Sequence, residues 1–249
     1  MAGAMRSIIL LLCMIAHNLF IVGQLSNKIK MYTFVTPSHQ VFLDQYFLPS
    51  FSVLKNDFDL EIAEFEQADS AAYFMGPGWN TMMLNKVHLI LRAIEETWGE
   101  IFVYADIDIQ FFNSFASIIP ALLAGKDLVT QHNHHLSCAG FFISRSNEKT
   151  KQLWLNVLTT MKSNPGLDDQ RALVAHLSQK TIPDLEYGLL DLRFFSPGII
   201  TGKLWNPGDE FTIPKGIFLH HANWTVGIAN KIEQLKYVQQ LYGNQLRSL

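Results

Sequence analysis

The 249-residue sequence contains few charged residues. Only 16% are Asp, Glu, Lys or Arg, and 19 basic against 22 acidic residues give a net charge of −3. Contacts to a nucleic acid backbone or an anionic membrane surface need clustered cations, so we predict no nucleic acid partner. The chain is nevertheless 49% hydrophobic, which excludes a disordered protein because it supplies enough apolar surface for a core.

Cysteine is also scarce. The two cysteines are Cys13, in the N-terminal segment, and Cys138. This number excludes an intramolecular disulfide framework, and we expect Cys138 to be a buried free thiol.

Several short motifs of nucleotide and hydrolase chemistry are missing. The sequence has no GxxxxGK[ST] phosphate loop, no GxGxxG, no GxSxG and no HExxH. Nothing in the sequence therefore supports hydride transfer, kinase chemistry or serine hydrolysis.

The N-terminal segment has no apolar run long enough for an ordinary membrane-spanning helix. Arg6 is followed by an apolar run at residues 8–16, whereas spanning takes about 20 residues. This layout predicts a signal peptide or signal anchor at residues 1–25, with a buried helix as the alternative. We therefore expect the secretory pathway, as a Golgi-lumenal or secreted protein, or the cytoplasm if the segment is not a signal.

Residues 26–249 show no linker rich in Pro, Gly or Ser, which predicts a single domain. Apolar runs with strand character occur at residues 29–35, 60–65, 101–105, 128–130, 139–144 and 216–219. Helical spacing of apolar residues occurs at residues 40–54, 83–98, 146–163, 168–177 and 230–242. Their alternation predicts an α/β fold with a mainly parallel central sheet flanked by helices.

Asp106 and Asp108 are the strongest candidates for chemistry. They follow the apolar run 101–105 and precede another at 109–112. Alternation along a strand would point both carboxylates the same way, where they repel each other unless a cation lies between them. A hard divalent ion, Mn²⁺ or Mg²⁺, is the natural partner. The similar pair Asp57 and Asp59 is interpreted as part of a solvated loop.

Two histidine clusters accompany this pair. His220 and His221 follow the run 216–219, and an imidazole there would add a third metal ligand. A pair of hydrogen-bonded histidines is the alternative. The second cluster contains His132, His134 and His135. It lacks a further ligand cluster at zinc-site spacing, so we interpret it as a loop lining the cleft.

Two further polar positions are candidates for substrate contacts. Asp168 is expected to cap the helix that follows it, which leaves Asp169 and Gln170 free to bond hydroxyl groups. Lys86 fits either a solvated lysine or a contact to a diphosphate.

The segment FVYADIDI at residues 102–109 resembles the metal-binding DxD segment of GT-A glycosyltransferases. It is most similar to the nucleotide-diphospho-sugar transferase group, which includes galactosyl- and xylosyltransferase-like enzymes. Further pieces occur in the family's order across about residues 31–231. They are VTPSH at 35–39, MLNK at 83–86, AGFFISR at 139–145, DQ at 169–170, and HANW at 221–224 with Gly227 and Lys231.

This resemblance implies a single GT-A type domain with Mn²⁺ or Mg²⁺ bound by Asp106, Asp108 and His221. It implies that Asp169 and Gln170 are catalytic residues beside the donor sugar. The residues implied to bind the nucleotide-sugar are Thr36, Lys86, Asp106, Gly140, Trp224, Gly227 and Lys231. The expected reaction is sugar transfer from a nucleotide-diphosphate donor, a UDP-sugar, with retention. The acceptor stays open among a glycan, a protein and a lipid-linked glycan.

Two alternatives remain at this stage. The same fold occurs with sugar-nucleotide pyrophosphorylase or hydrolase activity, but residues 31–45 lack the glycine-rich basic loop of a pyrophosphorylase. The other alternative is a secreted carbohydrate-binding protein without catalysis. The sequence Asn223-Trp224-Thr225 is formally an N-glycosylation site, and we expect it to be unmodified because a glycan there would block the cleft.

Overall fold

The computed structural model describes residues 28–68, 76 and 78–247. The predicted signal peptide or anchor at residues 1–25 lies outside these ranges. Among the described helices, none is long and apolar enough to cross a membrane.

The core is a six-stranded sheet in the order β2-β1-β3-β6-β5-β7. Its strands are β1 (Ile29–Val35), β2 (Phe58–Glu64), β3 (Ile101–Ala105), β5 (Leu128–Asn133), β6 (Leu136–Arg145) and β7 (Tyr187–Leu189). Only β6 runs antiparallel to its neighbours β3 and β5, and the remaining pairs are parallel. The predicted α/β class with a mainly parallel sheet is therefore confirmed.

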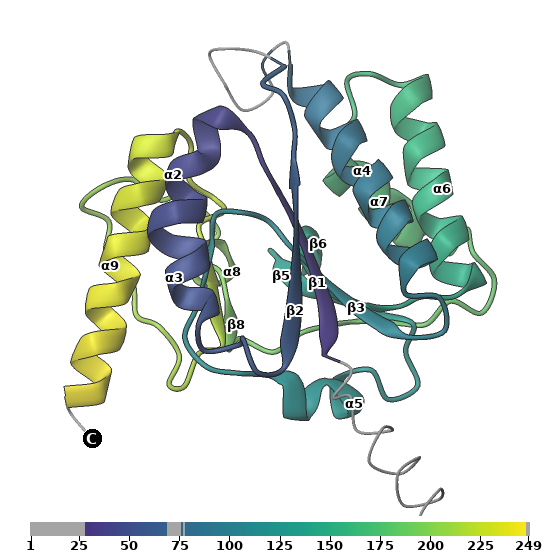
Figure 1. The fold of residues 1–249 in the computed structure, drawn as a ribbon. Helices are drawn as coiled ribbons and strands as arrows, with labels where there is room; N and C mark the ends of the chain where they lie inside the picture. Colours follow the sequence, from purple (N-terminus) through teal and green to yellow (C-terminus); the bar gives the residue numbers. More distant parts are fainter. Residues whose placement is uncertain (1–27, 69–75, 77, 248–249) are drawn as a thin grey trace, which may run out of the picture.

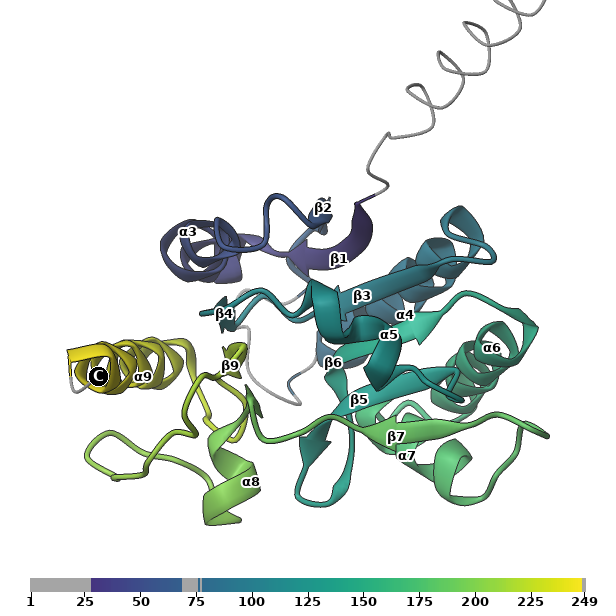
Figure 2. The ribbon, with the colours of Figure 1, turned by 90° about the horizontal axis from the view of Figure 1, so that it is seen from below.

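Helices and a second, smaller sheet cover the two faces of this sheet. On one face lie α4 (Trp79–Glu96), α6 (Glu148–Ser163) and α7 (Asp169–Ser178) (Figure 1). The other side carries α2 (Gln40–Phe42), α3 (Leu48–Phe51), α9 (Ile228–Arg247) and a sheet of β4 (Ile109–Phe111), β9 (Leu219–His221) and β8 (Phe194–Phe195). Figure 2 shows β4 and β9 between the large sheet and α9. Two short helices, α5 (Ile119–Leu122) and α8 (Pro197–Thr201), lie in the connections.

β3 is buried on both faces, as its apolar sequence predicts. Phe102 and Tyr104 pack into the core beneath α4, α6 and α7, whereas Val103 and Ala105 pack into the core on the opposite face. This alternation follows from the two-residue period of a strand. The central strand is thereby held between two apolar layers. The turn that follows it starts from this restrained position.

Some predicted elements differ in detail. The helix expected at residues 40–54 is broken into α2, a π-helical turn at Leu43–Phe47, and α3. Pro49 contributes to the irregularity because it has no N–H to donate to the preceding turn. Trp98, at the end of the apolar spacing that predicted a helix at residues 83–98, is 53% exposed and lies beyond α4, which ends at Glu96. Asp59 lies in β2 and not in a loop.

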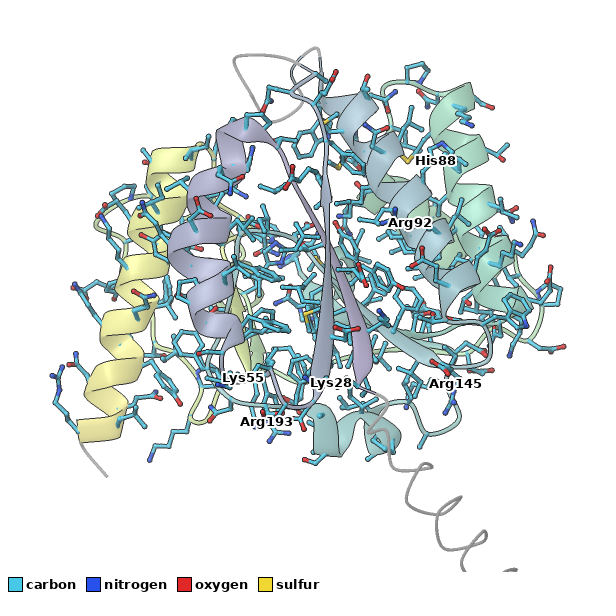
Figure 3. The ribbon with its side chains drawn as sticks, in the orientation of Figure 1. Lys28, Lys55, His88, Arg92, Arg145 and Arg193 are labelled. Carbon is cyan, nitrogen blue, oxygen red and sulfur yellow. The ribbon has the colours of Figure 1, made fainter. Side chains whose placement is uncertain are left out.

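The end of the molecule at which β1 begins carries several basic side chains. Figure 3 shows Lys28, Lys55, Arg145 and Arg193 along this edge. Three of them are engaged locally: Lys28 donates to a backbone carbonyl, Arg145 donates to two, and Arg193 pairs with Asp191 at 2.7 Å. These contacts hold loops together on the side of the sheet where β1 and β3 start.

Candidate functional site

The two aspartates lie in a tight turn that joins β3 to β4, outside both strands. The expectation that strand alternation orients them together is therefore wrong. Pairing between β4 and β9 instead brings this turn next to His220 and His221. Ile109 lies opposite His221, and the N–H of Ala222 donates to the backbone carbonyl of Asp108 at 3.0 Å.

Asp106, Asp108 and His221 present one ligand atom each within 4.8 Å of one another. His221 Nε2 is 3.3 Å from Asp108 Oδ1 and 3.9 Å from Asp106 Oδ2. His221 and Asp108 are buried, while Asp106 is half-buried. Two carboxylates and one imidazole form a donor set that fits a divalent cation with positions left for a substrate.

The acidic and basic side chains of this group form ion pairs with one another. Burial favours the neutral imidazole, but the Asp108 carboxylate outweighs it and raises the pKa of His221 to about 10. Burial likewise opposes ionisation of Asp108, yet Lys231 and His221 hold its pKa well below the usual range. Lys231 of α9 forms an ion pair with Asp108. A metal ion bound here would take the place of the proton on His221.

Gly140 supplies space beside these ligands. A Cβ atom built on it would lie within 3.0 Å of both His221 Cε1 and Asp106 Oδ2. The pairing of β5 with β6 shifts between Thr130 and Gln131, so that Gln131 lies opposite Cys138. On the other side of β6, the Gly140 carbonyl accepts the N–H of Asp106 at 2.7 Å, which continues the pairing of β6 with β3 beyond Ala105. The backbone of β6 thus lines the site where a side chain would fill it.

A buried lysine connects Asp106 to Asp169 at the start of α7. Lys86 is 3% exposed, and its Nζ lies 2.9 Å from Asp106 Oδ1 and 3.0 Å from Asp169 Oδ2. The hydroxyl of Tyr104 donates to Asp106 Oδ1 at 2.8 Å. The interpretation of Lys86 as a solvated lysine is therefore wrong. Burial raises the pKa of Asp169, and the ammonium of Lys86 opposes this rise.

Replacing Lys86 by methionine is expected to lower the free energy of unfolding by about 3 kcal/mol, because Asp169 is left as an unpaired buried carboxylate. The Lys151→Met variant is the control, since Lys151 pairs with Glu95 on an exposed surface and its loss should cost less than about 1 kcal/mol. Chemical denaturation of both variants measures the difference. Equal effects would mean that the buried ion pairs of Lys86 contribute no more than a surface pair.

Asp168 caps α7 as predicted, accepting the N–H of Arg171 at 2.8 Å. Gln170 is bound to the backbone of β6. Its Oε1 accepts the N–H of Ala139 at 2.8 Å, and its Nε2 donates to the carbonyl of Ser137. The amide therefore fixes the start of α7, and with it Asp169, against the strand that carries Gly140.

Three further residues implied to bind the nucleotide-sugar lie in connecting segments: Thr36 follows β1, and Trp224 and Gly227 lie between β9 and α9. Thr36 is buried after β1, where its hydroxyl lies 3.2 Å from His39 Nδ1. Gly227 has a φ of 89°, a left-handed conformation that suits glycine, at the entry to α9. Trp224 has a φ of 55°, and its indole N–H donates to Asn133 at 2.6 Å.

The second histidine cluster is split by the structure. His132 and Asn133 lie in β5, while His134 and His135 form the turn to β6, with φ values of 48° and 69°. The ring of His134 is 5.9 Å from that of Trp224. Cys138 is a buried free thiol, as expected.

His220 points away from the centre into a separate network. Its Nδ1 is 3.0 Å from Gln110 Nε2, and its Nε2 is 3.2 Å from Gln234 Oε1. Burial lowers its pKa to about 3. His220 is thus a hydrogen-bonded histidine, as the alternative interpretation expected. Its neighbour His221 is the histidine that lies with Asp106 and Asp108.

This shift predicts a loss of stability in mild acid. Because His220 has a lower pKa in the folded chain (about 3) than its ordinary 6.5, its contribution is complete above pH 6.5 and is lost as the pH falls towards 3. Between pH 7 and pH 5 the loss is about 2 kcal/mol. In the His220→Asn variant the free energy of unfolding should fall by that much less over this interval, as measured by denaturation at both pH values. An unchanged pH dependence would show that His220 titrates normally.

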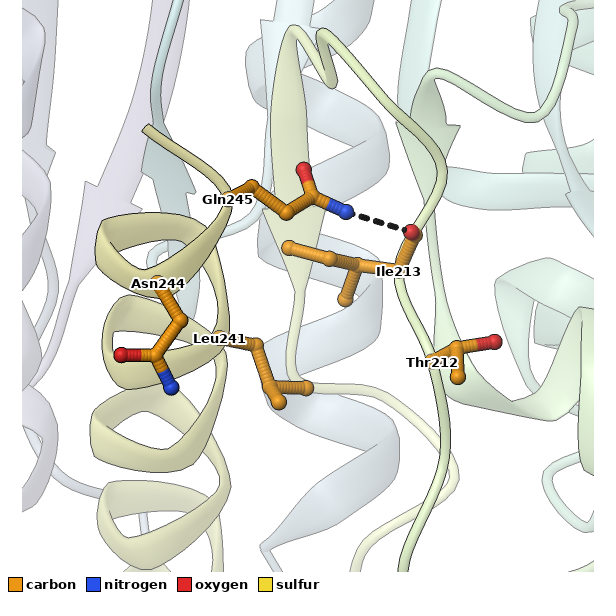
Figure 4. A pocket seen from close by; sticks show the side chains of 5 residues that line it. All are labelled: Thr212, Ile213, Leu241, Asn244 and Gln245. Carbon is orange, nitrogen blue, oxygen red and sulfur yellow. Dashed lines mark hydrogen bonds between the residues drawn. The ribbon is translucent and has the colours of Figure 1, made fainter. Parts of the chain in front are cut away.

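A pocket elsewhere in the described structure is separate from this site. It lies between α9 and the chain before β9 and is lined by Thr212, Ile213, Leu241, Asn244 and Gln245 (Figure 4). Leu241 is ten residues further along α9 than Lys231, which corresponds to about 15 Å. None of the residues that surround Asp106 and Asp108 lines it.

Three contributors to the site were missed at the level of sequence. The hydroxyl of Tyr104 and the amide of Gln131 contact metal-ligand candidates directly. His39 is close enough that the charges of Asp108, Lys231 and Asp106 act on its pKa, which burial lowers. A buried polar residue inside an apolar strand was the available signal for Gln131, but its partner could not be read from the sequence.

The structure is similar to a solved glycosyltransferase. Over 84% of this chain and 99% of the other, it superposes with a TM-score of 0.57 at 12% identity on a glycosyltransferase involved in the glycosylation of the major capsid of PBCV-1. At this identity the likeness concerns the fold, which is of the GT-A type. A comparison with curated protein sequences gave no match.

The sequence itself matches the profile of the nucleotide-diphospho-sugar transferase family over residues 50–235. This range contains the aspartate turn, the Gly140 strand, the start of α7, and His221. The chain therefore belongs to the nucleotide-diphospho-sugar transferase family and is a glycosyltransferase.

Proposed function

We propose that the protein is a manganese-dependent transferase that uses a UDP-sugar and retains the anomeric configuration. The observation that carries this proposal is the convergence of Asp106, Asp108 and His221 within 4.8 Å. An imidazole ligand favours Mn²⁺ over Mg²⁺, which prefers an all-oxygen shell. The bound cation would neutralise the negative charge that develops on the departing diphosphate.

Lys231 is proposed to bind the diphosphate. It is partly exposed, it pairs with Asp108, and it lies in the first turns of α9 behind Gly227. Cations next to a leaving phosphate stabilise charge that forms only in the transition state. The positive end of the α9 dipole adds to the same field.

Asp169 is proposed to bind hydroxyls of the donor sugar. Its carboxylate is buried, lies 3.0 Å from Lys86 Nζ, and is linked through that ammonium to Asp106. The chain Asp106–Lys86–Asp169 would fix the sugar's position relative to the diphosphate. Gln170 is then proposed to position Asp169, because its amide holds the start of α7 against β6.

Retention is proposed because the carboxylates near the centre all have cationic partners. Asp106 and Asp169 pair with Lys86, and Asp108 pairs with Lys231 and His221. A carboxylate engaged in such pairs is not free to take the proton of an incoming acceptor, which leaves the departing phosphate to accept it. Proton NMR of the product formed from a UDP-α-sugar tests this, with an α-linked product expected and a β-linked product contradicting it.

The experiment for the function is release of UDP from a panel of UDP-sugars by the full chain. We expect turnover with Mn²⁺ that stops on addition of EDTA and returns with excess Mn²⁺. UDP release without any donor preference or effect of acceptors would favour a sugar-nucleotide hydrolase. Sugar binding without turnover of any donor would favour the carbohydrate-binding alternative.

The acceptor and the compartment are separate proposals. We propose a glycan, protein or lipid-linked glycan acceptor in the secretory pathway, with residues 1–25 as signal peptide or anchor. The Asn223 side chain accepts a hydrogen bond from Ser196 and lies beside Cys138, which supports an unmodified Asn223. Glycopeptide mass spectrometry of active enzyme from a secretory host should find Asn223 bare, and occupancy there would contradict the proposed site.

A further inference from the structure

Gln131 connects the two sheets at the metal-ligand candidate His221. It belongs to β5 of the large sheet, is completely buried, and follows the shift in pairing with β6. Its Nε2 donates to the carbonyls of Phe194 and Phe195 in β8, at 3.1 and 3.0 Å. Its Oε1 is 2.8 Å from His221 Nδ1 in β9.

These bonds fix the orientation of the Gln131 amide. Two carbonyl oxygens accept hydrogen bonds only, so the group facing them must be the NH₂ and the group facing His221 must be the oxygen. Because an oxygen accepts, His221 Nδ1 must carry a proton. The other ring nitrogen, Nε2, is then the one that faces Asp108 and Asp106.

We infer that Gln131 is a positioning residue that sets the tautomer and orientation of His221 for metal binding. The inference rests on the proposed metal-dependent function, which supplies the need for an unprotonated Nε2. Hydrogen bonds from the second ring nitrogen of a metal-bound histidine commonly change metal affinity 10–100-fold. Here the acceptor is a neutral amide whose own direction is fixed by the second sheet.

Two variants separate this role from simple structural support. Gln131→Leu removes the acceptor for His221 and both donors to β8. Gln131→Glu keeps an oxygen for His221 Nδ1 but cannot donate to the two carbonyls. We expect Mn²⁺ binding, measured by electron paramagnetic resonance on the full chain, to weaken roughly 10–100-fold in Gln131→Leu and to be retained in Gln131→Glu.

Gln110→Leu is the matched control. Gln110 is equally buried, lies 3.0 Å from a histidine nitrogen, and donates to the Leu235 carbonyl at 3.0 Å, but its histidine is His220. We expect it to lower the melting temperature without changing the dissociation constant for Mn²⁺. In addition, ¹⁵N NMR of the Mg²⁺-loaded wild-type chain should show His221 protonated at Nδ1 only, a readout that needs no variant.

The possible results separate the role of Gln131 from the proposed metal-dependent function. Wild-type chain that binds Mn²⁺, with Gln131→Leu binding it equally well, would overturn the role of Gln131 and leave the function intact. Equal weakening in Gln131→Leu and Gln131→Glu, or a proton on His221 Nε2 in the metal-loaded chain, would overturn it too. Wild-type chain that binds no Mn²⁺ would overturn the metal site and this inference together.

Discussion

Replacing Asp108 by asparagine is expected to lower Mn²⁺-dependent release of UDP by about 10³-fold, which corresponds to about 4 kcal/mol of transition-state stabilisation. Asp108 is buried and contacts both His221 and Lys231. The amide keeps the shape of the side chain but removes the charge that holds the cation. The measurement is kcat/KM for UDP release with and without EDTA, together with the Mn²⁺ dissociation constant.

Asp127→Asn is the control for this change. Asp127 is a similarly buried acid, but it contacts Lys149, Asn147 and the N–H of Glu186. Its loss should lower stability and leave UDP release unchanged in the folded fraction. Near-normal, EDTA-sensitive turnover by Asp108→Asn would contradict the placement of the metal at this aspartate.

The Gly140→Ala variant is expected to lose at least about 100-fold in kcat/KM with little loss of fold. The added methyl group would lie within 3.0 Å of both His221 and Asp106, so both of these side chains must shift. Both are restrained, His221 by Gln131 and Asp106 by Lys86 and Tyr104. Displacement of a reacting group by about 1 Å is known to cost about 100-fold.

Gly243→Ala provides a matched control. Gly243 lies within α9, and a Cβ there meets no atom within 4 Å. Alanine should stabilise the helix by roughly 0.5–1 kcal/mol and leave activity unchanged. If Gly140→Ala instead retained full activity and metal affinity, the space beside His221 would have no functional role.

Much of the fold and part of the site could be predicted from the sequence, for identifiable physical reasons. β3 is buried on both faces, and its continuous apolar run was assigned to a central strand because it is too short for a helix. Asp168 was assigned as a cap because a carboxylate just before a helix can accept the free backbone N–H groups of the first turn. His221 was found because an imidazole complements two carboxylates, which is a matter of chemistry and not of position.

The remaining features depend on long-range pairing that leaves no local signal. Asp106 and Asp108, in the turn after β3, come next to His221 only because β4 pairs with β9, which is more than 100 residues away in the sequence. In the sequence, Lys86 cannot be distinguished from an ordinary helical lysine, because its partner Asp169 comes from α7, which is distant along the chain. The role of Gln131 depends on its hydrogen bonds to two carbonyls of β8. This strand has only two residues and is too short to be recognised in the sequence.

The most direct test of the account is the position of the cation. Anomalous diffraction from crystals of the protein grown with Mn²⁺ and UDP should give one strong peak bonded to Asp106, Asp108 and His221 Nε2, with the UDP diphosphate completing its coordination. A peak bonded elsewhere, or a shell that excludes His221, would contradict the central claim.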